Sequence, residues 1–211
     1  MVMLLNCSFR GEKSHSNYFL GLLENMLSKP CERKNLCTIK DFDKFVQELK
    51  NAETLVLGMP LYVDGAPAQV IEMMEKLYQN HKRKFGNLKV YVVTNLGFYE
   101  GKQAHILLKI VENWCNRMNF TYSGGVAIGA GEMLGGLRNV PCDKGPNTML
   151  GEGLKNLASH ITEGNVMEDM VIKPSGFPRI MYMLAGNMNW APQAKRNGLR
   201  KKDIKRKCCD N

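Results

Sequence analysis

A polar loop near the N-terminus, residues 7–17, carries the residue types that bind a phosphate group. It lies between a predicted strand and a predicted helix, and its side chains include Ser8, Arg10, Ser14 and Ser16. Hydroxyl groups donate hydrogen bonds to phosphate oxygens, and a guanidinium group can bind two of these oxygens at once. Free N–H groups at a helix N-terminus, and the positive end of the helix dipole, attract the same anion. Ser14 or Ser16 could instead cap the helix. Capping alone would leave Arg10 and Ser8 without a role, so we expect a phosphate site.

Two loops further along the chain carry residues suited to a flat aromatic ligand. The first, Met59-Pro60-Leu61-Tyr62-Val63-Asp64-Gly65-Ala66-Pro67, places an aromatic and two aliphatic side chains in a turn bounded by prolines. Its backbone N–H groups could meet the carbonyl groups of a heteroaromatic ring lying along it, although a packed connection fits the same residues. The second, Thr94-Asn95-Leu96-Gly97-Phe98-Tyr99-Glu100-Gly101, adds two aromatic side chains and glycines that let the backbone approach a ligand closely.

Two glycine-rich segments resemble nucleotide-binding motifs without matching them. Residues 97–103 have one residue too few between their glycines for a P-loop, and no hydroxyl residue follows the lysine. Residues 129–134 have a leucine where a dinucleotide-binding fingerprint needs its third glycine, and they follow the fifth predicted strand instead of the first. We interpret both as turn glycines, the second within a glycine-rich loop at residues 129–145.

Strands and helices alternate along the chain, and this order brings the three loops together. Apolar runs predict strands at residues 2–6, 36–39, 54–59, 90–94 and 120–128. Helical spacing predicts helices at residues 16–27, 42–49, 67–77, 103–118 and 148–161, and one more at 178–194 after the alternation stops. The alternation predicts an α/β fold, a three-layer sandwich with a mostly parallel sheet and helices on both faces. Ligands of such sheets bind beyond the carboxyl ends of the strands, where all three loops lie.

The composition is that of a globular protein that stays in the cytoplasm. The chain has 211 residues, of which 44% are hydrophobic and 23% charged, which excludes collagen-like and low-complexity classes. No apolar run is long enough to span a membrane, and the N-terminus has no basic segment of the kind found in signal peptides. The seven cysteines show no C-x-x-C spacing, so neither a disulfide framework nor a metal site is expected.

Positive charge is concentrated at the C-terminus. Residues 195–211, the basic tail, hold eight lysines and arginines and two aspartates, which is +6 of the chain's net charge of +9. Such a tail attracts anions, but no aromatic residues are interleaved within it, so nucleic acid is not the expected partner. A solvated helix end, or a surface for an anionic cofactor or subunit, fits better. The final Cys208-Cys209-Asp210-Asn211 is no prenylation box, because Asp210 is not aliphatic, and no membrane partner is expected.

Three motifs together resemble the flavodoxin-like NAD(P)H-dependent FMN reductase and quinone reductase superfamily, over residues 2–163. The motifs are Ser8-Phe9-Arg10-Gly11-Glu12-Lys13-Ser14-His15-Ser16, Pro60-Leu61-Tyr62-Val63-Asp64 and Thr94-Asn95-Leu96-Gly97. Cys7 stands where this family usually has a glycine. The resemblance implies a flavodoxin-like domain at residues 1–164, with a five-stranded parallel sheet of order 2-1-3-4-5, and a C-terminal helical extension at residues 165–211.

The resemblance also implies FMN as cofactor, with NADH or NADPH as hydride donor. The residues that would hold the FMN phosphate are Ser8, Arg10, Ser14, His15 and Ser16. The residues that would meet one side of the flavin ring are Pro60, Leu61, Tyr62, Val63 and Asp64. The residues on the other side would be Asn95, Gly97, Phe98 and Tyr99.

The implied activity is hydride transfer from nicotinamide to flavin N5, and onward to a small-molecule quinone, nitro, azo or flavin-type acceptor. The flavin supplies this chemistry, so no side chain is assigned as catalytic, although Tyr62, Tyr99 or Glu100 could shape the acceptor pocket. Two alternatives stay open: an electron carrier without its own NAD(P)H activity, and a non-enzymatic binding protein that uses its basic tail. The carrier is disfavoured because flavodoxins have a T-G-x-T-like phosphate loop and an acidic surface. This chain has Arg10 in that loop and a net charge of +9.

The family commonly dimerises, so a homodimer is implied, in which residues 165–211 embrace the partner or cover the flavin. Residues that could line a pocket in such a dimer are Met133, Met183, Met188 and Trp190. His105 and His160 fall on predicted helices, and we interpret them as surface residues.

Overall fold

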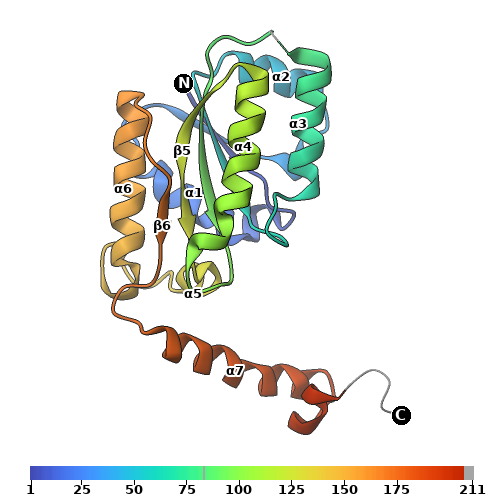
Figure 1. Ribbon diagram of the computed structural model, residues 1–211, viewed down its shortest axis with the longest axis vertical. Coiled ribbons are helices and arrows are strands. Elements are labelled where there is room, and N and C mark those ends of the chain that lie inside the picture. The colour runs from blue at the N-terminus through green and yellow to red at the C-terminus, as the bar shows by residue number, and fades with distance from the viewer. Residues whose placement is uncertain (83, 207–211) are drawn as a thin grey trace. The chain divides into compact units, whose positions relative to one another are not determined.

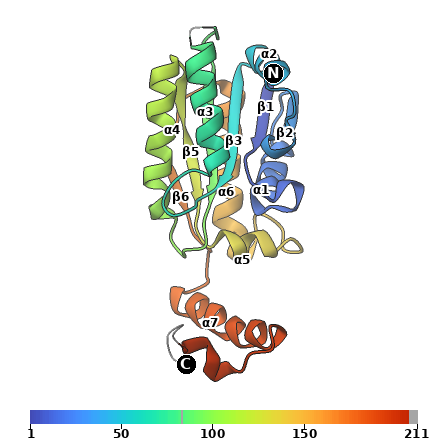
Figure 2. The ribbon, with the colours of Figure 1, turned by 90° about the vertical axis from the view of Figure 1, so that its right-hand side faces the viewer.

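The computed structural model describes residues 1–82 and 84–206, which form two compact units, Met1–Ser175 and the chain from Gly176 onward. The first unit is a three-layer α/β sandwich (Figures 1 and 2). Its strands are β1 (Val2–Asn6), β2 (Cys31–Asn35), β3 (Thr54–Pro60), β4 (Lys89–Asn95), β5 (Thr121–Ile128) and β6 (Met170–Ile172). They pair in parallel in the order β2-β1-β3-β4-β5-β6.

Helices cover both faces of this sheet. In chain order they are α1 (His15–Glu24), α2 (Phe42–Lys50), α3 (Ala68–His81), α4 (His105–Met118), α5 (Gly131–Gly136) and α6 (Thr148–Glu163). Short 3-10 helices occur at η1 (Gly11–Lys13), η2 (Leu36–Thr38), η3 (Gly101–Ala104) and η4 (Gly145–Asn147). Figure 2 shows α3 and α4 on one side of the sheet and α6 on the other. The predicted helices are therefore present, with ends shifted by a few residues.

Successive strand residues fill two separate cores, one on each face of the sheet. In β1, Met3 and Leu5 pack with residues of α2, α3 and α4, whereas Val2 and Leu4 pack with residues of α1 and α6. Every residue of β1 is buried, as the unbroken apolar run predicts for a strand covered on both faces. This double burial holds the carboxyl ends of β1, β3 and β4 in one row.

The expected five-stranded sheet is wrong by one strand. The three-residue β6 pairs with the end of β5, from Val126↔Met170 to Ile128↔Ile172. Ile172 is buried against α6, where Gly153 leaves the space for it. A strand this short has no readable alternation, and only pairing across about forty residues of chain creates it. Residues 165–175, assigned from sequence to the extension, therefore belong to the first compact unit.

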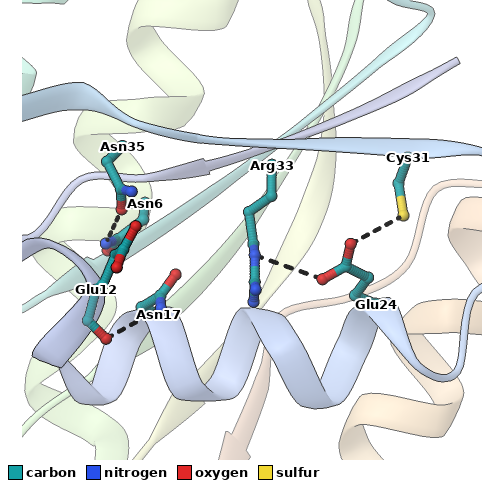
Figure 3. A network of polar contacts seen from close by, with 7 residues as sticks. All are labelled: Asn6, Glu12, Asn17, Glu24, Cys31, Arg33 and Asn35. Atoms are coloured by element: carbon teal, nitrogen blue, oxygen red, sulfur yellow. Dashed lines mark hydrogen bonds and ion pairs between the residues drawn. The ribbon is translucent and has the colours of Figure 1, made fainter. Parts of the chain in front are cut away.

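The second strand was also expected in the wrong place. The apolar residues 36–39 begin with the 3-10 helix η2, and β2 is formed by the polar residues 31–35 before them. Glu24 of α1 holds β2 from one side: it pairs with Arg33 (Nε to Oε2, 3.4 Å) and accepts from Cys31 (Sγ to Oε1, 3.8 Å). Figure 3 shows both contacts. An edge strand buries little surface, so its sequence need not be apolar.

The second unit consists of α7 (Arg179–Arg196) and the short 3-10 helix η5 (Lys201–Lys205). The helix predicted at residues 178–194 is thus confirmed. Within residues 1–82 and 84–206, no helix is long and apolar enough to cross a bilayer. The last residues of the basic tail, including Cys208-Cys209-Asp210-Asn211, lie outside the described residues.

Candidate functional site

Asn95, the last residue of β4, joins the three loops predicted to bind a ligand. Its side-chain oxygen accepts a hydrogen bond from the Ser16 hydroxyl of α1 at 2.7 Å. Its backbone carbonyl accepts from the Leu61 N–H at 2.9 Å, which fixes the start of the second loop. Ser16 and Asn95 are both buried. The first loop, the turn after β3 and the loop after β4 therefore meet at one edge of the sheet.

Asn6, the last residue of β1, is hydrogen-bonded through its side chain to several residues of the first loop. Its side-chain amide donates to the Gly11 carbonyl (2.9 Å) and to Asn35 Oδ1 (2.6 Å). Its side-chain oxygen accepts from the Ser8 N–H (3.2 Å) and the Ser14 hydroxyl (3.4 Å). Figure 3 shows Asn6 beside Asn35, its partner on the neighbouring strand β2. The sequence reasoning missed Asn6, although a polar residue ending an apolar strand just before the loop was a usable signal.

The hydroxyl groups of Ser8 and Ser14 are turned toward the backbone of the first loop. Ser14 caps α1: its oxygen accepts from the Asn17 N–H at 3.0 Å, and it lies 2.7 Å from the Gly11 carbonyl. The Ser8 oxygen accepts from the Arg10 N–H at 3.3 Å. The capping role that the sequence allowed for Ser14 is confirmed. The N–H groups of His15 and Ser16, in the first turn of α1, are left without an intrahelical acceptor, which suits an anion.

Two arginines flank the start of α1, and one of them was not expected. Burial lowers the pKa of His15, and the positive charges of Arg10 and Arg138 lower it further, which keeps the imidazole neutral. The ring packs against Gly135 of α5, where a side chain has no room. Arg138, just after α5, places its guanidinium 4.9 Å from the centre of the Tyr18 ring. Because Arg138 lies more than a hundred residues from the first loop, the sequence alone gave no signal for it.

The turn after β3 holds a strained and fully exposed apolar tip. Tyr62 and Gly65 exchange two backbone hydrogen bonds of 3.0 Å, and Val63 and Asp64 between them have φ values of 48° and 61°. This is a type I′ arrangement, which normally selects Gly, Asn or Asp. A β-branched residue is an outlier in the left-handed region, and such strain concentrates at binding sites. The Val63 side chain is 102% exposed, so its packing does not explain the strain.

The loop after β4 is fastened to the end of β5 and presents a second aromatic ring. The Leu96 carbonyl accepts from the Gly131 N–H at 2.7 Å, and the Phe98 carbonyl from the Ala130 N–H at 2.5 Å. The Phe98 side chain is 58% exposed, whereas Tyr99 is half-buried. At Gly97 a side chain would meet nothing within 4 Å, so open space borders the backbone there. Tyr62, Val63 and Phe98 therefore form an exposed apolar rim.

Other predicted residues of the edge are used for support. Leu61 is partly buried against the small cluster of Leu96, Ala104 and Ala127, and Pro60 ends β3. Cys7 is fully buried, and burial raises the pKa of its thiol above the ordinary range. Gln69, in the first turn of α3, donates to the Cys7 carbonyl at 2.6 Å, a contact that the sequence reasoning did not anticipate.

The donor set of this edge fits FMN. Arginines and unpaired helix N–H groups suit a phosphate group, and the exposed apolar rim suits a flat ring. Within the described part of the chain, no group of three His, Cys, Asp or Glu side chains could hold a metal ion.

No protein-family model and no curated protein sequence matches the chain. Among solved structures, an azoreductase from Bacillus anthracis has a TM-score of 0.53 at 15% identity, covering 77% of this chain and 98% of that one. An NADPH-quinone reductase from P. pentosaceus has a TM-score of 0.54 at 14% identity, covering 76% and 95%. An NAD(P)H:quinone oxidoreductase from Methanothermobacter marburgensis has a TM-score of 0.52 at 14% identity, covering 76% and 94%. At these identities the likeness shows the fold, so the resemblance noted in the sequence is confirmed as a flavodoxin-like α/β fold.

Proposed function

We propose that this chain is an FMN-dependent oxidoreductase that uses NADH or NADPH to reduce a quinone, nitro, azo or flavin-type acceptor. The observation that carries the proposal is the meeting, at one sheet edge, of a cationic helix N-terminus with the strained apolar tip at Val63. The fold likeness to azoreductases and quinone reductases supports the same class. A homodimer and a cytoplasmic location stay predictions from the sequence resemblance.

Ser8, Arg10, Ser14, His15 and Ser16 are the residues proposed to form the phosphate site, joined by Arg138. The hydroxyls of the three serines shape the loop through hydrogen bonds within the protein. Neutral His15 adds no positive charge of its own, so the two arginines supply the charge that attracts the anion. The N–H groups at the start of α1 bind the phosphate oxygens directly. Asn6 holds the loop in place beneath the anion.

The proposed ring site lies between the turn at residues 60–64 and the residues Asn95, Gly97, Phe98 and Tyr99. A bound flavin would supply the redox chemistry there, accepting hydride at N5. The backbone of residues 61–64 would meet the polar edge of the ring, while Tyr62, Val63 and Phe98 would exclude water from its faces. Gly97 lets the backbone approach the ring closely, because no side chain fills the open space beside it.

Titration of the purified protein with FMN and with riboflavin, followed by visible absorption, tests the phosphate site. Arg10→Ala should weaken FMN binding by about tenfold or more, since a charge-assisted hydrogen bond is lost. Riboflavin has no phosphate, so its affinity should not change. Arg117→Ala, at an exposed position on α4, is the matched control. A protein that binds neither flavin would overturn the proposal.

Oxidation of NADH or NADPH in the presence of a quinone then separates an enzyme from an electron carrier. Turnover by the FMN-loaded protein supports the reductase. A protein that holds FMN but does not oxidise either nucleotide would be an electron carrier instead.

A further inference from the structure

Helix α7 has a broad apolar face that the described residues of its own unit leave exposed. Ile180, Met183, Leu184 and Met188 follow the i, i+3, i+4, i+8 spacing of one helix face. Their side chains are 55–75% exposed. Trp190, seven residues after Met183, lies on the same side and is 58% exposed. Contiguous apolar surface of this kind marks a binding surface.

A dense positive charge adjoins this face. The chain from residue 176 to 211 has nine lysines and arginines but only two aspartates, a net charge of +7 out of +9 for the whole protein. Asp203 is the one acidic residue among its described positions. Its carboxylate accepts a hydrogen bond from the Arg200 N–H at 2.8 Å. The lysines of η5, namely Lys201, Lys202 and Lys205, are all exposed.

The apolar face and the charges belong to one compact unit. The Leu199 N–H donates to the Ala194 carbonyl at 2.8 Å, and Ala194 is buried. This contact turns the chain back against the end of α7, so that η5 begins beside the helix. Leu199 and Ile204 are themselves 51% and 41% exposed, and they extend the apolar surface into the basic segment.

We propose that α7 and η5 lie on an anionic lipid bilayer, with the apolar face at the boundary of headgroups and acyl chains and the lysines on the lipid phosphates. An amphipathic helix next to a polybasic cluster is the combination that binds such surfaces. Methionine side chains are flexible enough to pack among fluid acyl chains, and tryptophan prefers the interface. The expectation of no membrane partner considered spanning segments and a prenylation box, neither of which a helix lying in the interface needs.

Other binding partners would match only one of the two features, the apolar face or the positive charge. A second copy of residues 176–211 would cover the apolar face, but it brings the same charge of +7 against the first. A nucleic acid would neutralise the lysines, but it would leave Ile180, Met183 and Met188 in water. The bilayer satisfies both features at once. This inference involves none of the residues of the proposed FMN site, and it can be tested without flavin.

Sedimentation of the full-length protein with lipid vesicles tests the proposal. We expect binding to phosphatidylcholine vesicles that contain phosphatidylglycerol, weak binding to phosphatidylcholine alone, and loss of binding at high salt. Lys201→Gln, Lys202→Gln and Lys205→Gln together should weaken binding at least tenfold. The control Lys144→Gln, Lys155→Gln and Lys173→Gln removes the same charge from exposed sites of the first unit and should change binding less than about twofold.

Tryptophan fluorescence reports the depth of the helix directly. The chain has two tryptophans, Trp114 and Trp190. Trp114 is buried, with its indole N–H on the Met74 carbonyl at 3.2 Å. A blue shift of emission on adding anionic vesicles should therefore arise from Trp190 and disappear in Trp190→Phe. Met188→Gln should weaken binding without unfolding the protein, because that side chain is exposed.

Four results would overturn the proposal. The first is absence of binding to anionic vesicles, and the second is equal binding to neutral ones. The third is a dimer in sedimentation equilibrium that Met188→Gln dissociates and vesicles do not compete with, which would assign the face to a second copy. Tighter binding to DNA than to vesicles, unaffected by Met188→Gln, would assign the charges to nucleic acid.

Discussion

Buried polar groups meet at the carboxyl edge of the sheet, whereas exposed apolar groups line α7. At the edge, Asn6 and Ser16 lie almost completely out of water, and each is hydrogen-bonded within the protein. These hydrogen bonds tie the loops to the ends of the strands. Along α7, the apolar side chains from Ile180 to Trp190 gain little from their own unit. The first region suits the small-molecule site proposed for it, and the second suits the proposed contact with a lipid surface.

The largest expected effect tests whether the edge supports itself. Asn6→Ala would remove the partner of Asn35 Oδ1 and of the buried Ser8 N–H, and should lower the free energy of unfolding by about 3 kcal/mol. Urea denaturation measures it. Met188→Gln on α7, and Asn113→Ala at an exposed position on α4, should each change it by less than about 0.5 kcal/mol. Equal losses of unfolding free energy in Asn6→Ala and Met188→Gln would show that the sheet edge is no more important for stability than the exposed face of α7.

Two glycines at the edge should behave oppositely. A Cβ at Gly129 would collide with backbone atoms of residues 99–101, whereas one at Gly97 would meet nothing. Gly129→Ala should therefore cost about 2 kcal/mol of stability, and it should also weaken FMN binding because the loop after β4 must move. Gly97→Ala should leave stability within about 0.5 kcal/mol. A harmless Gly129→Ala would mean that this loop is not fixed by its contact with β5.

The backbone strain at Val63 should lower the stability of the protein while its side chain contributes to FMN binding. Val63→Asn relieves the left-handed conformation, which costs an L-residue about 1–2 kcal/mol, and should raise the free energy of unfolding by about 1 kcal/mol. The same change should weaken FMN binding about fivefold, because roughly 1 kcal/mol of apolar contact with the ring is lost. Denaturation and flavin titration of one protein preparation measure both. If stability rises and affinity does not fall, Val63 has no part in binding.

The smallest effect is the pH dependence due to His15. Its folded pKa lies below the unfolded value because of burial and the nearby Arg10 and Arg138. The unfolded chain then binds more protons between the two values, so the free energy of unfolding should rise with pH over that interval and level off above about 6.5. His81, whose pKa burial also lowers, adds a slope of the same sign.

The difference between the wild type and His15→Gln isolates the His15 contribution, measured as urea midpoints from pH 5 to pH 7.5. Residues 176–211 contain no histidine, so vesicle binding should not change over this range. A histidine-like transition in vesicle binding would show that α7 depends on the first unit.

Much of the fold could be predicted because it rests on local patterns. The unbroken apolar runs of β1 and β3 and the periodicity of α4 reflect burial that every residue of the element shares. The two errors, β2 and β6, concern edge strands at opposite ends of the sheet. An edge strand is defined by pairing with a distant neighbour, and that pairing leaves little trace in its own residues.

The candidate site could be predicted in part for the same reason. Loops that follow successive parallel strands must meet at one edge, so residues 8–16, 60–64 and 95–99 were predicted together. The partners that fix them were not, because Arg138 beside His15, Gln69 on the Cys7 carbonyl and Asn35 on Asn6 each join distant parts of the chain.

By itself, the sequence determined the order of the central elements, the polar loop at α1 and the amphipathic character of α7, because hydrophobic spacing and residue chemistry are local properties. Tertiary structure alone decided three other features. The hydroxyls of Ser8 and Ser14 turn inward, Val63 is exposed in a strained left-handed conformation, and the described residues of the second unit leave the apolar face of α7 exposed. Each depends on which groups from remote segments are present to pack or to accept a hydrogen bond, and no local pattern records that.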